Sequence, residues 1–263
     1  MNRRQARTRD VMAALETLAP RGLALEEDRE NIGLQVGDPQ IRVSRVLVAL
    51  DATLPVIEEA AETGCELLVT HHPLIFGGLK RVRWDERVGR CVAALCSRGV
   101  GLLCAHTNLD AARGGVNDAL CAALGLENIA DMGDLGRVGA LHQAMAPGEL
   151  QRWVGGALGG SPWLVPGSEA IRRVAVVGGA GGEFLGAALE AGAQALVTGE
   201  LKHHEALEAR HLGLTAVMAG HHATEVVAVP ALANGLQKAL DALEYGDVIE
   251  IGTSKRAEDP FVW

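Results

Sequence analysis

The sequence has no long uninterrupted apolar run. A membrane-spanning helix needs roughly 18 such residues, and no stretch of the 263-residue chain reaches that length. The arginine-rich N-terminal region is followed by an amphipathic stretch instead of the continuous apolar segment of a signal peptide. We therefore expect no membrane span and a protein that stays in the cytoplasm.

Paired cysteines are also missing. The five cysteines are an odd number, and no two of them have CxxC spacing. Because they lie in or beside apolar patterns, we expect buried, reduced thiols and no cysteine zinc site. The positions are Cys65, Cys91, Cys96, Cys104 and Cys121.

The chain has no excess of positive charge. Its net charge is -9, whereas a nucleic-acid-binding domain normally shows a basic patch or stripe. The composition therefore gives no strong signal for a nucleic-acid partner.

Histidines and carboxylates, in contrast, gather at the ends of apolar runs. His71 and His72 directly follow the run at residues 67–70, which is typical of a buried parallel strand. His106 and Asp110 follow a second run at 100–105. His221 and Glu225 follow a third run at 214–219. Because open α/β sheets bind ligands beyond the carboxyl ends of their strands, these side chains predict a ligand site.

The order of the expected elements indicates an α/β fold. A strand at 46–50, a helix at 55–63 and a strand at 67–70 form a βαβ unit, which predicts parallel neighbours. Further helices are expected at 8–19, 86–98 and 223–243. Residues 61–70 resemble residues 189–198 in a helix, glycine and strand arrangement.

This repeat predicts two related α/β lobes that face each other, with mixed or mainly parallel sheets. The first lobe is expected at 1–130 plus 220–263, and the second at 131–219. The boundary falls where the sequence becomes rich in glycine and aspartate.

A glycine-rich stretch, Gly178-Gly179-Ala180-Gly181-Gly182, follows a further apolar run. Such a turn before a helix is able to bind phosphate on backbone N–H groups. The stretch is neither a Walker loop nor a clean GxGxxG motif, so an ordinary turn is the stronger interpretation.

The side chains at the three strand ends suit divalent metals. Imidazole nitrogens and carboxylate oxygens bind zinc, iron, manganese, cobalt or nickel. His221 and Glu225 are four residues apart, so they share one face at a helix start. Five ligands are too many for one tetrahedral site and suit two open sites about 3.5–4 Å apart, bridged by a carboxylate and a hydroxide. The predicted ligands are His71, His72, Asp110, His221 and Glu225.

Other histidines near these motifs have open roles. His106 is a candidate for proton transfer, substrate contact or support of a ligand, and His203 and His204 have similar standing. We name His106 and His204 as candidate catalytic residues. Asp51 is either an acid that supports the site or the cap of the following helix. We assign no role to His142 and His211.

These motifs, in their order, resemble the YbgI-like dinuclear metal-centre family, which is related to the NGG-interacting factor and labelled as type 2 homologues of GTP cyclohydrolase I. The resemblance covers nearly the whole chain. The segments that carry it are Asn31-Ile32-Gly33-Leu34-Gln35-Val36-Gly37-Asp38-Pro39, Thr70-His71-His72-Pro73-Leu74, His106-Thr107-Asn108-Leu109-Asp110, Thr198-Gly199-Glu200 with His203-His204, and Gly220-His221-His222-Ala223-Thr224-Glu225.

The resemblance implies a dinuclear site made by the same five ligands, two α/β lobes with the metals in the cleft, and a toroidal homohexamer. The chain departs from the family pattern at two places. Arg29-Glu30 stands where family members often carry Trp-Asp, and the extension from Thr253 has no counterpart that we recognise.

The leading functional hypothesis is a metal-dependent hydrolase of the cyclohydrolase or amidohydrolase kind, which uses a bridging hydroxide on a small substrate, with nucleotide-like substrates among the candidates. The alternative is a non-catalytic, ring-shaped metal-binding adaptor for protein partners. The sequence leaves both hypotheses open.

Overall fold

The computed structural model describes residues 5–261. The chain divides into two compact units, Met1–Arg113 with Val229–Glu258 (unit 1) and Gly114–Ala228 with Asp259–Trp263 (unit 2). The sequence analysis placed the two changes of lobe at 130/131 and 219/220. In the structure the chain enters unit 2 earlier, because the helix that begins at Val116 packs on two strands of the unit 2 sheet.

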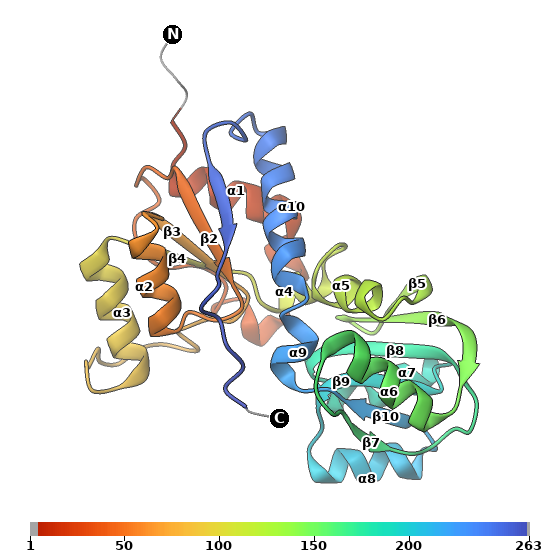
Figure 1. Cartoon of the computed structure of the whole chain (residues 1–263). Helices are drawn as coiled ribbons and strands as arrows, with labels where there is room; N and C mark the ends of the chain where they lie inside the picture. The colour runs from red at the N-terminus through yellow and green to blue at the C-terminus, as the bar shows by residue number, and fades with distance from the viewer. Residues whose placement is uncertain (1–4, 262–263) are drawn as a thin grey trace. The chain divides into compact units, whose positions relative to one another are not determined.

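Unit 1 is built around a five-stranded sheet with the order β1-β4-β3-β2-β11. Strands β2, β3, β4 and β11 are parallel, and β1 is antiparallel to β4. Figure 1 shows α2 and α3 on one side of this sheet and α1 and α10 on the other. The elements are β1 (Gly33–Val36), β2 (Arg45–Ala49), β3 (Leu67–Thr70), β4 (Gly101–Cys104), β11 (Glu250–Thr253), α1 (Thr8–Leu18), α2 (Leu54–Glu62), α3 (Arg87–Arg98), α4 (Thr107–Ala111) and α10 (Ala228–Ala242), with short 3-10 turns η1 (Arg21–Leu23) and η2 (Glu26–Asp28).

Unit 2 holds a six-stranded mixed sheet with the order β5-β6-β8-β9-β10-β7. Strands β8, β9 and β10 are parallel, and β5, β6 and β7 join as antiparallel strands. The sequence analysis predicted neither the β5–β6 hairpin nor β7. The elements are β5 (Glu127–Met132), β6 (Gly136–Met145), β7 (Trp163–Val165), β8 (Ile171–Ala180), β9 (Ala195–Glu200), β10 (Thr215–Met218), α5 (Val116–Ala123), α6 (Pro147–Leu158), α7 (Leu185–Glu190), α8 (His203–His211) and α9 (His221–Glu225), with the 3-10 turn η3 (Gly182–Phe184).

Both faces of the unit 2 sheet are buried, as continuous apolar strands predict. Along β8, Val174 and Val176 face the core under α5 and α6, whereas Ala175 and Val177 face the core under α7 and α8. This alternation follows from the two-residue period of a strand. The structure therefore confirms an α/β fold with mixed sheets.

One predicted helix is in fact two. The pattern from 223 to 243 predicted a continuous helix, but α9 ends at Glu225 and α10 begins at Ala228. Pro230 explains the break, since proline has no N–H for the helical bond to Val226 and its ring clashes with that carbonyl. Because of the break, His221 and Glu225 lie on a short helix of their own.

Four of the five cysteines are buried, and all five are free thiols. Burial raises the pKa of the Cys121 thiol to about 12 and that of Cys104 well above its usual value. Cys96 is exposed on α3, contrary to the expectation that all five are buried. No helix within residues 5–261 combines the length and the apolar character needed to cross a bilayer.

A buried carboxylate on α2 attaches the segment that follows β11. Glu59 accepts hydrogen bonds from the Ser254 hydroxyl and from the backbone N–H groups of Lys255 and Arg256. Burial alone would raise the pKa of Glu59, but these hydrogen bonds outweigh it and hold the pKa below the ordinary value of 4.5. The ionised carboxylate therefore stabilises the folded chain.

We predict that Glu59→Gln lowers the free energy of unfolding at pH 7 by about 1–3 kcal/mol, because buried donors lose a charged acceptor. A carboxyl group whose pKa is lower in the folded than in the unfolded chain stabilises the folded state fully at a pH above its unfolded pKa. This stabilisation is lost as the pH falls through the pKa of the folded state. The difference between wild type and variant should therefore shrink below pH 4.5. Urea unfolding across pH measures it, with Glu58→Gln as the neighbouring control. An equal difference at pH 7 and at acid pH would contradict the assignment.

Candidate metal centre

Three histidine rings come together at the carboxyl end of the unit 1 sheet. Ligand atoms of His71, His72 and His106, one from each ring, all lie within 4.8 Å of one another. The ring centroid of His71 is 4.9 Å from that of His72 and 5.2 Å from that of His106. Two of the predicted metal ligands and one predicted catalytic residue therefore share a site.

The backbone at the end of β3 explains why two adjacent histidines converge. The His71 N–H donates to the Ala49 carbonyl, and the His72 N–H donates to the Leu50 carbonyl. The Thr70 hydroxyl donates to the His72 carbonyl at 2.8 Å, which turns the chain directly after the strand. On a regular strand the two side chains would point to opposite faces, so this turn is what brings both rings together.

Each of the three rings has its Nδ1 next to a fixed oxygen acceptor. The distances are 3.0 Å from His71 to the Ala105 carbonyl, 2.9 Å from His72 to Asp51 Oδ1, and 2.9 Å from His106 to Asp28 Oδ2. A carbonyl only accepts, so Nδ1 of His71 carries the proton, and the two carboxylates favour the same tautomer. This leaves Nε2 of each ring as the atom that donates a lone pair, the arrangement typical of metal-bound histidines.

Asp28 was missed by the sequence analysis. Its carboxylate is buried and accepts hydrogen bonds from His106, from the Thr107 hydroxyl and from Asn31. Burial alone would raise the pKa of Asp28, but these hydrogen bonds and the nearby His106 hold it well below its usual range. Asp28 lies three residues before Asn31, where the first family motif begins. This closeness to the motif was the one sequence signal that could have pointed to Asp28.

Asp110 lies on the one-turn helix α4, beside the histidines. Its Oδ1 is 3.6 Å from Nε2 of His71, and its side chain is 13 % exposed. The predicted ligands of unit 1 thus present imidazole nitrogens and a carboxylate oxygen to one region. This donor set fits a divalent cation of the zinc, iron, manganese, cobalt or nickel kind.

Unit 2 contains a second group of ligand atoms, at the end of β10. His221 Nε2 lies 3.2 Å from Glu225 Oε1, as expected for residues four apart on a helix. His221 Nδ1 lies 3.1 Å from Glu200 Oε1, so a carboxylate again holds the far side of the ring. The sequence analysis quoted Glu200 in a motif but gave it no role.

The glycine-rich stretch lies against the Glu225 carboxylate. The Gly178 N–H donates to Asn117 Oδ1 and the Gly179 N–H to the Thr224 hydroxyl, so neither is directed at a ligand. A Cβ on Gly179 would clash with Glu225 Oε1 and lie 3.0 Å from His221 Nε2. The first part of the stretch is a strand and not the expected turn, because β8 continues to Ala180. These glycines allow the backbone to approach the ligand pair closely.

The two groups occupy equivalent places in their own sheets. Each sheet contains three adjacent parallel strands, β2-β3-β4 and β8-β9-β10. The repeat seen in the sequence falls on β3 and β9. His106 and Asp110 follow β4, and His221 and Glu225 follow β10, and in both pairs the acid comes four positions after the histidine.

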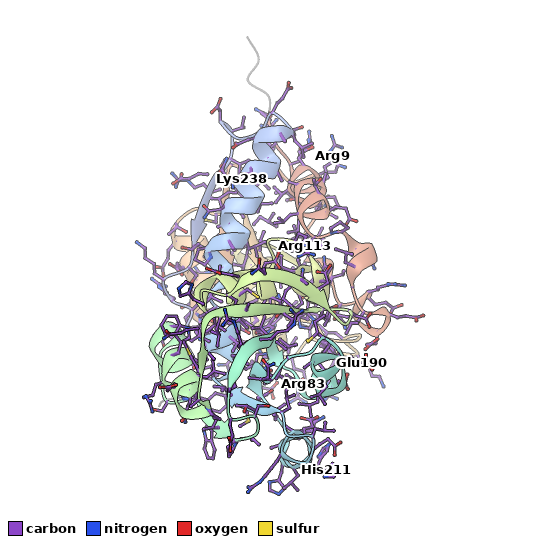
Figure 2. The ribbon with its side chains drawn as sticks, turned by 90° about the vertical axis from the view of Figure 1, so that its right-hand side faces the viewer. Arg9, Arg83, Arg113, Glu190, His211 and Lys238 are labelled. Carbon is purple, nitrogen blue, oxygen red and sulfur yellow. The ribbon has the colours of Figure 1, made fainter. Side chains whose placement is uncertain are left out.

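The remaining histidines lie elsewhere. His203 and His204 are exposed in the first turn of α8, and they belong to none of the ligand groups found in the described part of the chain. His142 and His211 are exposed as well, and Figure 2 shows His211 projecting from the end of its helix. A catalytic role of His204 therefore stays a prediction.

Comparison with known proteins agrees with these motifs. The model of the family described as Duf34/NIF3 (NGG1p interacting factor 3) matches residues 6–260. A Clostridium perfringens protein named "GTP cyclohydrolase 1 type 2 homolog" is 32% identical over 262 residues, covering 96% of this chain and 97% of its own.

Solved structures agree as well. A Bacillus cereus protein related to NIF3 superimposes with a TM-score of 0.90 at 25% identity and covers 99% of both chains. The protein ybgI, of unknown function, has a TM-score of 0.82 at 24% identity, with 95% of this chain and 98% of its own covered, and shares the fold. The chain therefore belongs to the Duf34/NIF3 (NGG1p interacting factor 3) family.

Proposed function

We propose that this protein is a metal-dependent hydrolase that acts on a small substrate, with nucleotide-like substrates among the candidates. The observation that carries the proposal is the arrangement of four histidines. In each of them Nδ1 lies beside a fixed oxygen, so that Nε2 is the nitrogen with a lone pair for a metal or a proton; the four are His71, His72, His106 and His221. The names of the curated relatives support the cyclohydrolase type, since they are termed type 2 homologues of GTP cyclohydrolase 1.

The proposed ligands are the five predicted from the sequence, and we propose that they hold two divalent cations in one centre. The reason is the number of ligands. His221 and Glu225 are too few to hold a metal by themselves, and a site made only of the unit 1 ligands would leave this pair without a role. Two such cations would lower the pKa of water and polarise a substrate carbonyl or ring carbon. The ligands are His71, His72, Asp110, His221 and Glu225.

The chain's own carboxylates would orient this centre. Asp51 and Glu200 accept from Nδ1 of His72 and His221 and thus hold each ring in the tautomer that keeps Nε2 unprotonated. His106 is paired in the same way with Asp28, but it lies outside the proposed ligand set. We assign to its Nε2 the transfer of a proton to or from the substrate, supported by the ionised Asp28.

A second candidate function is a ring-shaped, metal-binding adaptor for protein partners, and exposed apolar residues of unit 1 fit the ring that it requires. Phe76 is 71% exposed and Trp84 is 75% exposed, in the irregular segment between β3 and α3. Leu79 and Val82 in the same segment are also exposed. Clustered exposed apolar side chains of this kind mark protein contacts. We propose that the 76–84 segment joins copies of the chain in a homohexamer.

The first prediction concerns metal content. Wild type purified without chelators should contain about two metal equivalents per chain, and Asp110→Ala should contain one or none, because a bridging carboxylate serves both cations. Mass spectrometry of the purified protein measures both values. Asp134→Ala, an exposed aspartate in the β5–β6 turn, should keep the wild-type content. Unchanged metal in Asp110→Ala would exclude the dinuclear proposal.

The second prediction separates proton transfer from ligation at His106. His106→Gln should retain the metal content while kcat falls about 100- to 10,000-fold, the usual contribution of a general acid or base. Asp28→Asn should lower kcat in the same direction, since an amide stabilises the wrong tautomer. Steady-state kinetics on a substrate found by screening, together with metal analysis, test this. Loss of metal from His106→Gln would instead make His106 a ligand.

The third prediction concerns assembly. Wild type should sediment as a hexamer, and Phe76→Ser and Trp84→Ser should sediment as smaller species, because each replaces apolar contact area with a hydroxyl. Sedimentation velocity at matched concentrations measures this. Trp163→Ala removes an equally exposed tryptophan outside the segment and should leave the hexamer intact. Identical sedimentation of wild type and both serine variants would exclude the segment as an interface.

A further inference from the structure

The first family motif, residues 31–39, begins at the edge of the unit 1 sheet where the histidines lie. Its strand β1 runs antiparallel to β4, and the first residue of β1 pairs with the last residue of β4. The residues at the start of the motif therefore stand at the carboxyl end of β4, the end that leads to His106. Two polar side chains of the motif, Asn31 and Gln35, have no part in the ligand set or in the proposed proton transfer.

An irregularity in β1 determines where the Gln35 side chain points. Leu34 pairs with Leu103 and Val36 pairs with Leu102, so the register shifts at Gln35, as in a β-bulge. A bulge redirects the side chain of the extra residue, and bulges are common beside active sites. The side chain of Gln35 is thus directed at the segment that follows β3.

The side-chain amide of Gln35 binds the chain just after the two ligand histidines. Its Oε1 accepts from the backbone N–H groups of Leu74 at 2.8 Å and Ile75 at 3.2 Å. Its Nε2 donates to the carbonyl groups of Ile75 at 2.7 Å and Asn31 at 2.8 Å. These bonds use both lone-pair positions and both N–H groups of the amide. Because Leu74 comes two residues after His72, Gln35 holds the backbone that carries this ligand.

Asn31 connects the same segment to the proposed proton-transfer pair. Its Oδ1 accepts from the Gly77 N–H at 2.8 Å, and its Nδ2 donates to Asp28 Oδ1 at 3.1 Å. The other carboxylate oxygen, Asp28 Oδ2, accepts from His106 Nδ1. Asn31 and Asp28 are 4% and 3% exposed, so both groups are shielded from water. A side-chain amide suits this place, because it donates to a carboxylate and accepts from an N–H at the same time.

We propose that Asn31 and Gln35 are positioning residues for the candidate metal centre. Asn31 orients His106 through Asp28, and Gln35 orients His72 through the backbone that follows it. Without the Asn31 amide, the Asp28 carboxylate loses a donor on Oδ1 and gains freedom to rotate, so the acceptor of His106 Nδ1 is no longer fixed. This inference deepens the proposed function and rests on it, since it takes His72 as a ligand and His106 as the group that transfers a proton.

The test for Asn31 is the tautomer of His106. Nuclear magnetic resonance of the full, metal-free chain with nitrogen-15 in its histidines reports it at a pH of about 8.5, where imidazole is neutral. The His106→Gln variant identifies the signal. Wild type should carry the proton on Nδ1. Asn31→Leu, which has nearly the same shape, should raise the population with the proton on Nε2 about tenfold, in line with the loss of one hydrogen bond. Asn31→Ala should shift the tautomer in the same direction, and it replaces Asn31→Leu if that variant is unfolded.

The test for Gln35 is the affinity of the chelator-treated protein for Zn²⁺, measured by competition with a zinc indicator. Gln35→Met has nearly the same length and loses all four hydrogen bonds of the amide. It should bind Zn²⁺ about 10- to 100-fold more weakly, the usual cost of removing a group that orients a metal-bound histidine. An unchanged affinity in folded Gln35→Met would overturn the role of Gln35. An unchanged His106 tautomer in the folded Asn31 variants would overturn the role of Asn31.

Glu59→Gln is the matched control, because it also removes hydrogen bonds from a buried side chain of unit 1. It should keep the wild-type His106 tautomer and Zn²⁺ affinity. Equal changes in Glu59→Gln and in the motif variants would indicate general destabilisation and overturn the proposal. Neither measurement uses a substrate, so wild type that binds Zn²⁺ without hydrolase activity contradicts the proposed function alone. Wild type that binds no Zn²⁺ contradicts the proposed function and the role of Gln35, whereas the tautomer still decides the role of Asn31.

Discussion

The hydrogen bond between each imidazole Nδ1 and a fixed oxygen is the constraint on which the candidate centre depends. An imidazole without such a partner exchanges between two tautomers and rotates about its side-chain bonds, so a hydrogen bond to Nδ1 orients the ring and keeps Nε2 ready for a metal. Here the Ala105 carbonyl fixes His71, and carboxylates fix His72, His106 and His221. The fold places these oxygen acceptors next to the histidine rings.

The parallel strands supply that presentation. Because β2, β3 and β4 end at the same edge, Asp51, His72 and His106 emerge close together although they are separated by up to 55 residues in the sequence. The same logic holds in unit 2 for β9 and β10, which bring Glu200 to His221. The glycines at the end of β8 complete this arrangement, since any side chain on Gly179 would displace Glu225. Each unit thus holds its own group of ligand residues at the ends of three adjacent parallel strands.

Charge explains why the centre suits a cation. Asp28 is buried and stays ionised because His106, Thr107 and Asn31 donate to it, and Asp110 and Glu225 place further carboxylate oxygens beside histidine nitrogens. Buried negative charge is costly unless hydrogen bonds or a cation compensate it. The carboxylates near the histidines are therefore of the kind that a divalent metal could bind.

The sequence by itself determined the local part of this picture. Apolar runs that end in histidine predicted β3, β4 and β10, and the four-residue spacing from His221 to Glu225 predicted a shared helix face, because both signals depend only on neighbouring residues. Tertiary structure decided the rest. Asp28 meets His106, which comes 78 residues later, and Trp163 lines a pocket with Phe261, which comes 98 residues later. The spacing of apolar and polar residues along the sequence does not predict such pairs, because they are brought together by the order of the strands in the sheet and by the course of the loops.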